Sequence, residues 1–166
     1  MNRCPKCESL LIRASDPEAG VHSHSCTNCG FSNNTIEVPA DQLHRRAVPT
    51  SSLTLGGLLK HLALCEDRFT AEFLRGEPIR EPWASVDGSP WAWGWTSSLD
   101  DPADDLYAVW SQAVRRARAA WSEAIGDGGL GQPSKLVFDD GACPTLRRAL
   151  VDLSDEYEIG RASCRE

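Results

Sequence analysis

Two pairs of cysteines near the N-terminus constrain the fold of this chain more than any other feature. The pairs are Cys4 with Cys7 and Cys26 with Cys29. Two intervening residues let both sulfur atoms of a pair face one ion, and the segment between the pairs is long enough for a hairpin that brings them together. Four thiolates around a tetrahedral Zn²⁺ fit this spacing. The sequence therefore predicts that these four cysteines bind a structural zinc in a small β zinc ribbon over residues 1–35.

Composition and charge narrow the class of protein. The 166 residues are 41% hydrophobic and 25% charged, which is typical of a globular chain. No apolar run approaches the length of a membrane helix, and no membrane partner is expected. The N-terminus lacks the apolar segment of a signal peptide, so we expect a cytoplasmic protein whose paired cysteines bind metal. The net charge of −7 comes without clustered lysines and arginines, which argues against a nucleic-acid partner.

The rest of the chain divides into three further parts. Residues 36–51 contain Pro39 and Pro49 and form a connector. Residues 52–157 show helical periodicity and few strand signals, so a helical bundle is predicted there. Residues 158–166 back-translate into a sequence that resembles a common sequencing adapter, and we interpret them as a non-native tail.

The segment 52–99 is predicted to contain one helix followed by an irregular loop. Apolar residues three and four positions apart predict a helix that Ser51 or Ser52 caps and that ends near Arg75. Four of the six tryptophans then lie among glycine, proline and serine residues in 77–99. This composition predicts an irregular loop folded onto the body of the protein.

Two more helices are predicted in the second half of the chain. Asp101 is expected to be the N-cap of a helix that ends at Gly126, and Pro144 begins the last helix. The apolar stripe of the first of these helices carries Trp110 and Trp121. The opposite, solvated face is expected to carry three arginines, Arg115, Arg116 and Arg118.

Three segments carry a resemblance to a known family. They are Leu-His-Arg-Arg-Ala-Val-Pro at 43–49, Ser-Leu-Thr-Leu-Gly-Gly-Leu-Leu-Lys-His-Leu at 52–62 and Leu-Arg-Arg-Ala-Leu-Val at 146–151. From about Glu37 to Tyr157 the chain resembles the DinB/YfiT-like helical bundles, which include the N-terminal domains of mycothiol-dependent maleylpyruvate isomerases. The resemblance implies an all-α, up-down four-helix bundle, incomplete here at both ends. It also implies a metal-dependent and thiol-dependent transferase or isomerase.

The same resemblance implies a metal site in the bundle. Many members of the family hold a divalent metal with three histidines, and the first of these matches His61. Zinc or nickel held in this way, with one coordination position open, would activate a low-molecular-weight thiol. The family's other histidines follow a triplet on the last helix that reads here Asp155-Glu-Tyr157, and this chain has no histidine after it. We therefore expect the chain to be inactive as it stands.

The roles of several other residues, and a second possible function, remain to be considered. Glu66 and Asp67 are either carboxylate ligands beside His61 or surface residues. Cys65 is expected to be a small apolar core residue, and Cys143 is expected to have no catalytic role because no histidine or lysine adjoins it. The alternative function is a protein-binding or nucleic-acid-binding zinc ribbon on a non-catalytic helical scaffold.

Self-association is a further expectation. A bundle that lacks its first helix would leave part of its apolar stripe uncovered, including Leu58, Leu62 and Phe69. Large exposed apolar patches mark interaction surfaces, so the sequence predicts a homo-oligomer.

Overall fold

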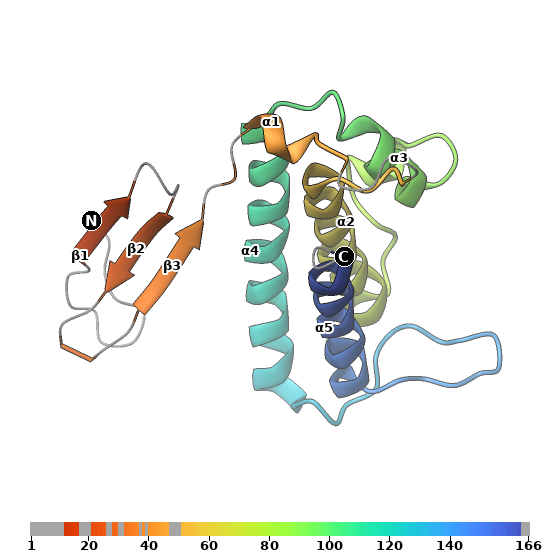
Figure 1. The fold of residues 1–166 in the computed structure, drawn as a ribbon. Coiled ribbons are helices and arrows are strands. Elements are labelled where there is room, and N and C mark those ends of the chain that lie inside the picture. The colour runs from red at the N-terminus through yellow and green to blue at the C-terminus, as the bar shows by residue number, and fades with distance from the viewer. Residues whose placement is uncertain are drawn as a thin grey trace. The chain divides into compact units, whose positions relative to one another are not determined.

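The computed structural model describes residues 12–16, 21–25, 28–29, 32–36, 38, 40–46 and 51–163. The chain divides into two compact units, Met1–Leu43 and His44–Glu166, which are described separately (Figure 1). Three of the predicted zinc ligands, Cys4, Cys7 and Cys26, lie outside the described residues. Among the helices of the described ranges, none is both long enough and apolar enough to cross a bilayer.

The first unit contains a three-stranded antiparallel sheet. Its strands are β1 (Ile12–Asp16), β2 (Val21–Ser25) and β3 (Ser32–Ile36), in the order β1-β2-β3. The third strand adds to the hairpin that the cysteine spacing predicts. Ile12 pairs with Ser25 and Ser25 pairs with Ser32, so these three residues lie at one end of the sheet. The short helix α1 (Ala40–Leu43) follows.

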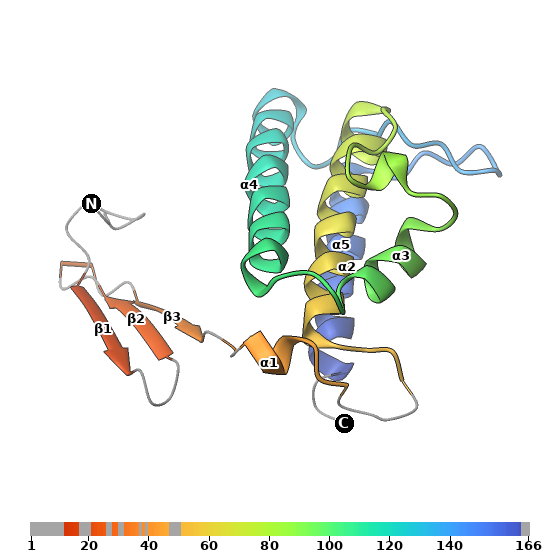
Figure 2. The ribbon, with the colours of Figure 1, turned by 90° about the horizontal axis from the view of Figure 1, so that it is seen from above.

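The second unit is a helical bundle, as predicted. Helix α2 (Leu55–Arg68) continues into the π-helical segment η1 (Phe69–Arg75). The short α3 (Pro90–Ser97), the long α4 (Ala103–Gly128) and α5 (Leu146–Ser163) follow. Helix α2 packs against each of the other three helices, and Figure 2 shows α3 and α4 on opposite sides of it. Side chains that project from α2 in different directions therefore meet different helices.

The start of α2 differs from the prediction. Thr54, and neither Ser51 nor Ser52, is the N-cap: its hydroxyl accepts the backbone N–H of Gly57 at 2.9 Å. Thr54 has the extended conformation that an N-cap requires, with φ at −132°. Gly57 has a second role, because a Cβ atom at this position would overlap the ring of Trp95. The glycine therefore lets α3 approach α2 closely.

The tryptophan-rich segment is more ordered than the predicted irregular loop. It contains the 3₁₀ turn η2 (Trp83–Ser85) and the helix α3. Ser89 caps α3 by accepting the N–H of Ala92, and Pro90 stands at the start of the helix. Trp83 is buried and donates its indole N–H to Asp67 at 3.0 Å. The prediction was wrong because the glycine and proline content obscured a Ser-Pro helix start.

The start of α4 also differs from the prediction. The helix begins at Ala103, with Pro102 at the N-cap position and no side-chain cap bond. Asp101 instead accepts a hydrogen bond from Nζ of Lys60 at 2.6 Å, so its carboxylate connects this turn to α2. The helix runs past Gly126 to Gly128 and ends where Gly129 adopts φ +70°, a conformation that favours glycine.

The core of the bundle lies between α2 with η1, α4 and α5. One cluster of buried residues consists of Cys65, Phe69, Phe73, Ala117, Trp121, Leu146, Ala149 and Leu153. A second cluster consists of Ala63, Leu64, Trp83 and Ala113. Leu62 is buried as well. Two residues of the stripe expected to be uncovered, Leu62 and Phe69, are therefore covered within the single chain and provide no reason for self-association.

Candidate metal site

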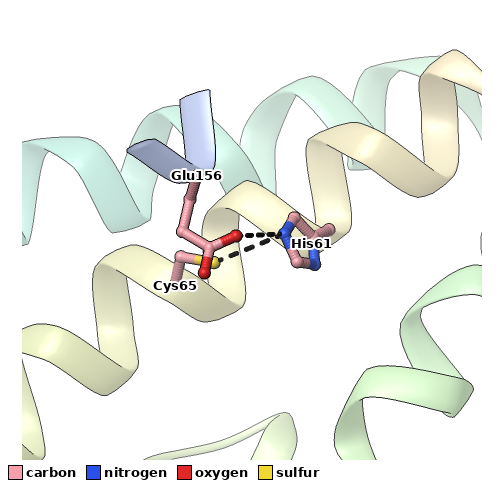
Figure 3. Close-up of side chains that lie close together, drawn as sticks. All are labelled: His61, Cys65 and Glu156. Carbon is pink, nitrogen blue, oxygen red and sulfur yellow. Dashed lines mark hydrogen bonds and ion pairs between the residues drawn. The ribbon is translucent and has the colours of Figure 1, made fainter. Parts of the chain in front are cut away.

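Three potential metal donors from two helices, His61, Cys65 and Glu156, lie close together (Figure 3). Nε2 of His61 lies 3.1 Å from Oε2 of Glu156 and 3.7 Å from Sγ of Cys65. His61 and Cys65 share one face of α2 because they are four residues apart, whereas Glu156 comes from α5. The three donor atoms all lie within 4.8 Å of one another. A single ion could therefore contact all three.

The distances and the donor types fit a divalent metal. Zinc binds imidazole nitrogen, thiolate sulfur and carboxylate oxygen at about 2.0 to 2.3 Å, so two donors of a tetrahedral ion are about 3.3 to 3.8 Å apart. The separations of 3.1 and 3.7 Å lie close to this range. Three protein donors are also the usual number in a catalytic zinc site, which keeps a fourth position for substrate.

The site lies at the edge of the core. The side chains of His61 and Glu156 are 19% and 31% exposed, whereas Cys65 is fully buried. Burial raises the pKa of the Cys65 thiol, and the nearby Glu156 carboxylate raises it further. The thiol is therefore protonated at neutral pH in the metal-free protein. A bound cation reverses this preference because it favours the thiolate.

Two tryptophans of α3 enclose the imidazole. The ring centres of Trp91 and Trp95 lie 5.3 and 5.4 Å from that of His61, and Trp95 is stacked on it at an interplanar angle of 21°. Nδ1 of His61 is buried and has no hydrogen-bond partner among the described residues. A metal-binding histidine usually donates its second N–H to an acceptor, so this feature lowers the expected metal affinity.

Neither of the two carboxylates next to Cys65 belongs to the donor group. Glu66 accepts a hydrogen bond from the hydroxyl of Tyr157 at 2.5 Å. Asp67 accepts two hydrogen bonds from Nη2 of Arg116, each at 2.9 Å. Both carboxylates are buried, so they are not surface residues. Among the described residues, neither belongs to the group of donor atoms around His61.

The predicted arginine face of α4 is also wrong in part. Arg116 forms an ion pair with the buried Asp67 and is only partly exposed. Arg115 and Arg118 line a groove of about 530 Å³ together with Trp110 and Trp121. Arg118 therefore lies on the same side of the helix as Trp121, because the two residues are three positions apart.

The outcomes for the other predicted residues differ. Cys65 is a buried core residue, as predicted, and contacts His61 as well. The sequence prediction missed Glu156 because the family resemblance implies histidine ligands on the last helix. The signal was present, since this residue is the central member of the Asp155-Glu-Tyr157 triplet. Of the predicted ribbon ligands, Cys29 is described and is exposed.

Comparisons with known proteins identify the family. A family model described as "Mycothiol-S-transferase" matches residues 31–158. This range includes His61, Cys65 and Glu156. No curated protein and no solved structure matches the chain. The helical bundle and the family match together confirm the DinB/YfiT-like resemblance, and the chain belongs to the mycothiol-S-transferase family.

Proposed function

We propose that the helical unit binds one divalent metal ion, zinc or nickel, through His61, Cys65 and Glu156. It uses the ion to transfer a thiol to an electrophilic acceptor. The convergence of three donors of zinc-binding type, from two helices, is the observation that carries this proposal. Membership of the mycothiol-S-transferase family supports it, since this family suggests metal-dependent chemistry on a thiol. The partner is a low-molecular-weight thiol such as the mycothiol of the family description.

His61, the two tryptophans and Glu156 have distinct roles in this proposal. A coordinated zinc or nickel ion lowers the pKa of a bound thiol and so supplies a thiolate near neutral pH. His61 donates Nε2, while Trp91 and Trp95 hold the imidazole plane and exclude water from its faces. Glu156 is partly exposed, so its second carboxylate oxygen can accept the proton of an incoming thiol. Such thiols are kept reduced in the cytoplasm, which is the location that we propose.

Metal content tests the site directly. The protein is stripped with a chelator and titrated with Co²⁺, whose absorption bands report its ligands. We expect His61→Ala to abolish binding at the bundle site. His44→Ala is the matched control, because Nδ1 of His44 contacts the carbonyl of Ser98 and lies outside the donor group. Equal Co²⁺ binding by wild type and His61→Ala would refute the site.

Turnover is tested separately from metal binding. The sequence led us to expect an inactive chain, because His61 has no histidine partner. Cys65 and Glu156 supply two other donors, and we propose that the activity is weakened instead of absent. A thiol-transfer assay with an electrophilic acceptor, with and without added metal, decides between these outcomes. Metal binding without metal-dependent turnover would support the inactive alternative.

We also propose a structural zinc at Cys4, Cys7, Cys26 and Cys29. The register of the sheet supports this, because Ile12, Ser25 and Ser32 lie at one end of it. In the chain, the first cysteine pair precedes Ile12, and the second pair lies between Ser25 and Ser32. A second zinc equivalent that survives His61→Ala and is lost in Cys4→Ser is the expected result. Unchanged zinc content in Cys4→Ser would contradict it.

A further inference from the structure

A hydrogen bond next to the candidate metal site connects α2 to α5. The Tyr157 hydroxyl donates to Oε1 of Glu66 at 2.5 Å, between residues that are 91 positions apart. Glu66 is only 7% exposed. The Trp110 indole of α4 lies 3.4 Å from the same hydroxyl. Groups of three helices therefore meet at Tyr157.

This hydrogen bond is adjacent to the metal donors on both helices. Glu66 directly follows Cys65, and Tyr157 directly follows Glu156. Each residue along an α-helix adds about 1.5 Å of rise and about 100° of rotation. A screw displacement of α5 by one residue, which combines this rise with this rotation, would therefore turn Glu156 away from His61. The Tyr157–Glu66 hydrogen bond opposes that displacement.

We infer that Glu66 and Tyr157 are positioning residues that hold the Glu156 carboxylate beside His61 and Cys65. The inference rests on the proposed metal site. Neither residue touches the metal or the substrate in this assignment. Their contribution is the register of α5 against α2. For comparison, loss of a hydrogen bond made directly to a metal ligand typically changes metal affinity by about 10- to 100-fold.

Co²⁺ titration of four variants tests the inference. Tyr157→Phe removes the donor and Glu66→Leu removes the acceptor, and each should weaken Co²⁺ binding by at least about tenfold. Glu66→Gln should bind nearly as well as wild type, since its amide oxygen still accepts from Tyr157. Asp67→Asn is the matched control: it alters the next buried carboxylate of α2, which contacts α4 through Arg116. Folded Tyr157→Phe and Glu66→Leu with wild-type affinity, or an equal loss in Asp67→Asn, would overturn the inference.

A measurement on the metal-free protein separates this inference from the proposed function. Cys65 is fully buried, so its alkylation rate reports whether α5 stays in place. The rate should rise in Tyr157→Phe and Glu66→Leu and stay near the wild-type value in Glu66→Gln and Asp67→Asn. The free energy of unfolding of each variant is measured in parallel. The contribution of global unfolding to the alkylation rate of Cys65 can then be subtracted. Absent Co²⁺ binding at the bundle site in wild type, seen as equal Co²⁺ binding by wild type and His61→Ala, would refute the metal site. Equal alkylation rates of Cys65 in all variants, after correction for unfolding, would refute the positioning role.

Discussion

Glu156 of α5 places its Oε2 3.1 Å from Nε2 of His61 on α2, although 95 positions separate the two residues. Cys65 joins them from the same face of α2 as His61. The donor group therefore exists only while α5 packs against α2. This relationship makes metal affinity a sensitive measure of how the two helices are arranged.

Addition of a donor on α5 should strengthen metal binding. Position 160 lies within α5, four residues and one turn beyond Glu156, and so on the same helix face. Gly160→His should raise Co²⁺ affinity by at least about tenfold, which corresponds to about 1.4 kcal/mol. Gly160→Ala is the control: it should stabilise the helix by up to about 1 kcal/mol and add no donor. Equal Co²⁺ affinities of the two variants would show that position 160 does not reach the site.

The buried carboxyl of Glu66 should make stability depend on pH. Burial raises its pKa above the ordinary 4.5, although the hydrogen bond from Tyr157 opposes the shift. The folded state therefore holds the proton more tightly than the unfolded state. This contribution to stability is fully present below pH 4.5 and is lost as the pH rises through the folded pKa.

Glu66→Gln removes this titration, and denaturant unfolding of the metal-free protein measures it. The free energy of unfolding of wild type minus that of the variant should decrease as the pH rises above about 4.5. A difference that is constant or increases with pH would show that burial does not govern this carboxyl.

Loss of the Arg116 guanidinium should destabilise the bundle. Its Nη2 lies 2.9 Å from each oxygen of Asp67, whose side chain is only 4% exposed. Arg116→Leu leaves that buried carboxylate with one hydrogen bond, from Trp83, and should cost about 1 to 3 kcal/mol. The neighbouring Arg115 is exposed, so Arg115→Leu should change stability by no more than about 0.5 kcal/mol. Chemical denaturation measures both, and equal effects would contradict the assignment.

Two glycine-to-alanine substitutions should have opposite signs. A Cβ atom at Gly57 would overlap the Trp95 ring, so Gly57→Ala should cost about 1 to 3 kcal/mol and displace the ring stacked on His61. Gly126 lies inside α4 with no atom near its potential Cβ. Gly126→Ala should therefore stabilise the protein by up to about 1 kcal/mol. Thermal unfolding tests the signs, and a stabilising Gly57→Ala would refute the close approach of α3.

The sequence predicts the three long helices α2, α4 and α5 because their signals are local, whereas it missed the short α3. The spacing of apolar residues predicts that Cys65 of α2 and Phe69 of η1 share one buried face, and both are buried. Local signals failed where tertiary contacts compete with them. Asp101 has the chemistry of an N-cap, but the Lys60 ammonium binds its carboxylate. Ser51 and Ser52 could also cap a helix, but Thr54 is the residue at the boundary.

In the candidate site, too, local sequence signals and tertiary contacts determined different features. The sequence by itself determined that His61 lies at the edge of the α2 stripe, that Cys65 lies one turn away, and that Glu156 lies on the last helix. Only the tertiary structure decided that Glu156 meets His61 and that Glu66 meets Tyr157 instead. Helical periodicity defines which residues share a face, but it contains no information on the rotation and axial offset of one helix against another. Those two quantities result from the packing of all the helices together, and they determine which side chains meet.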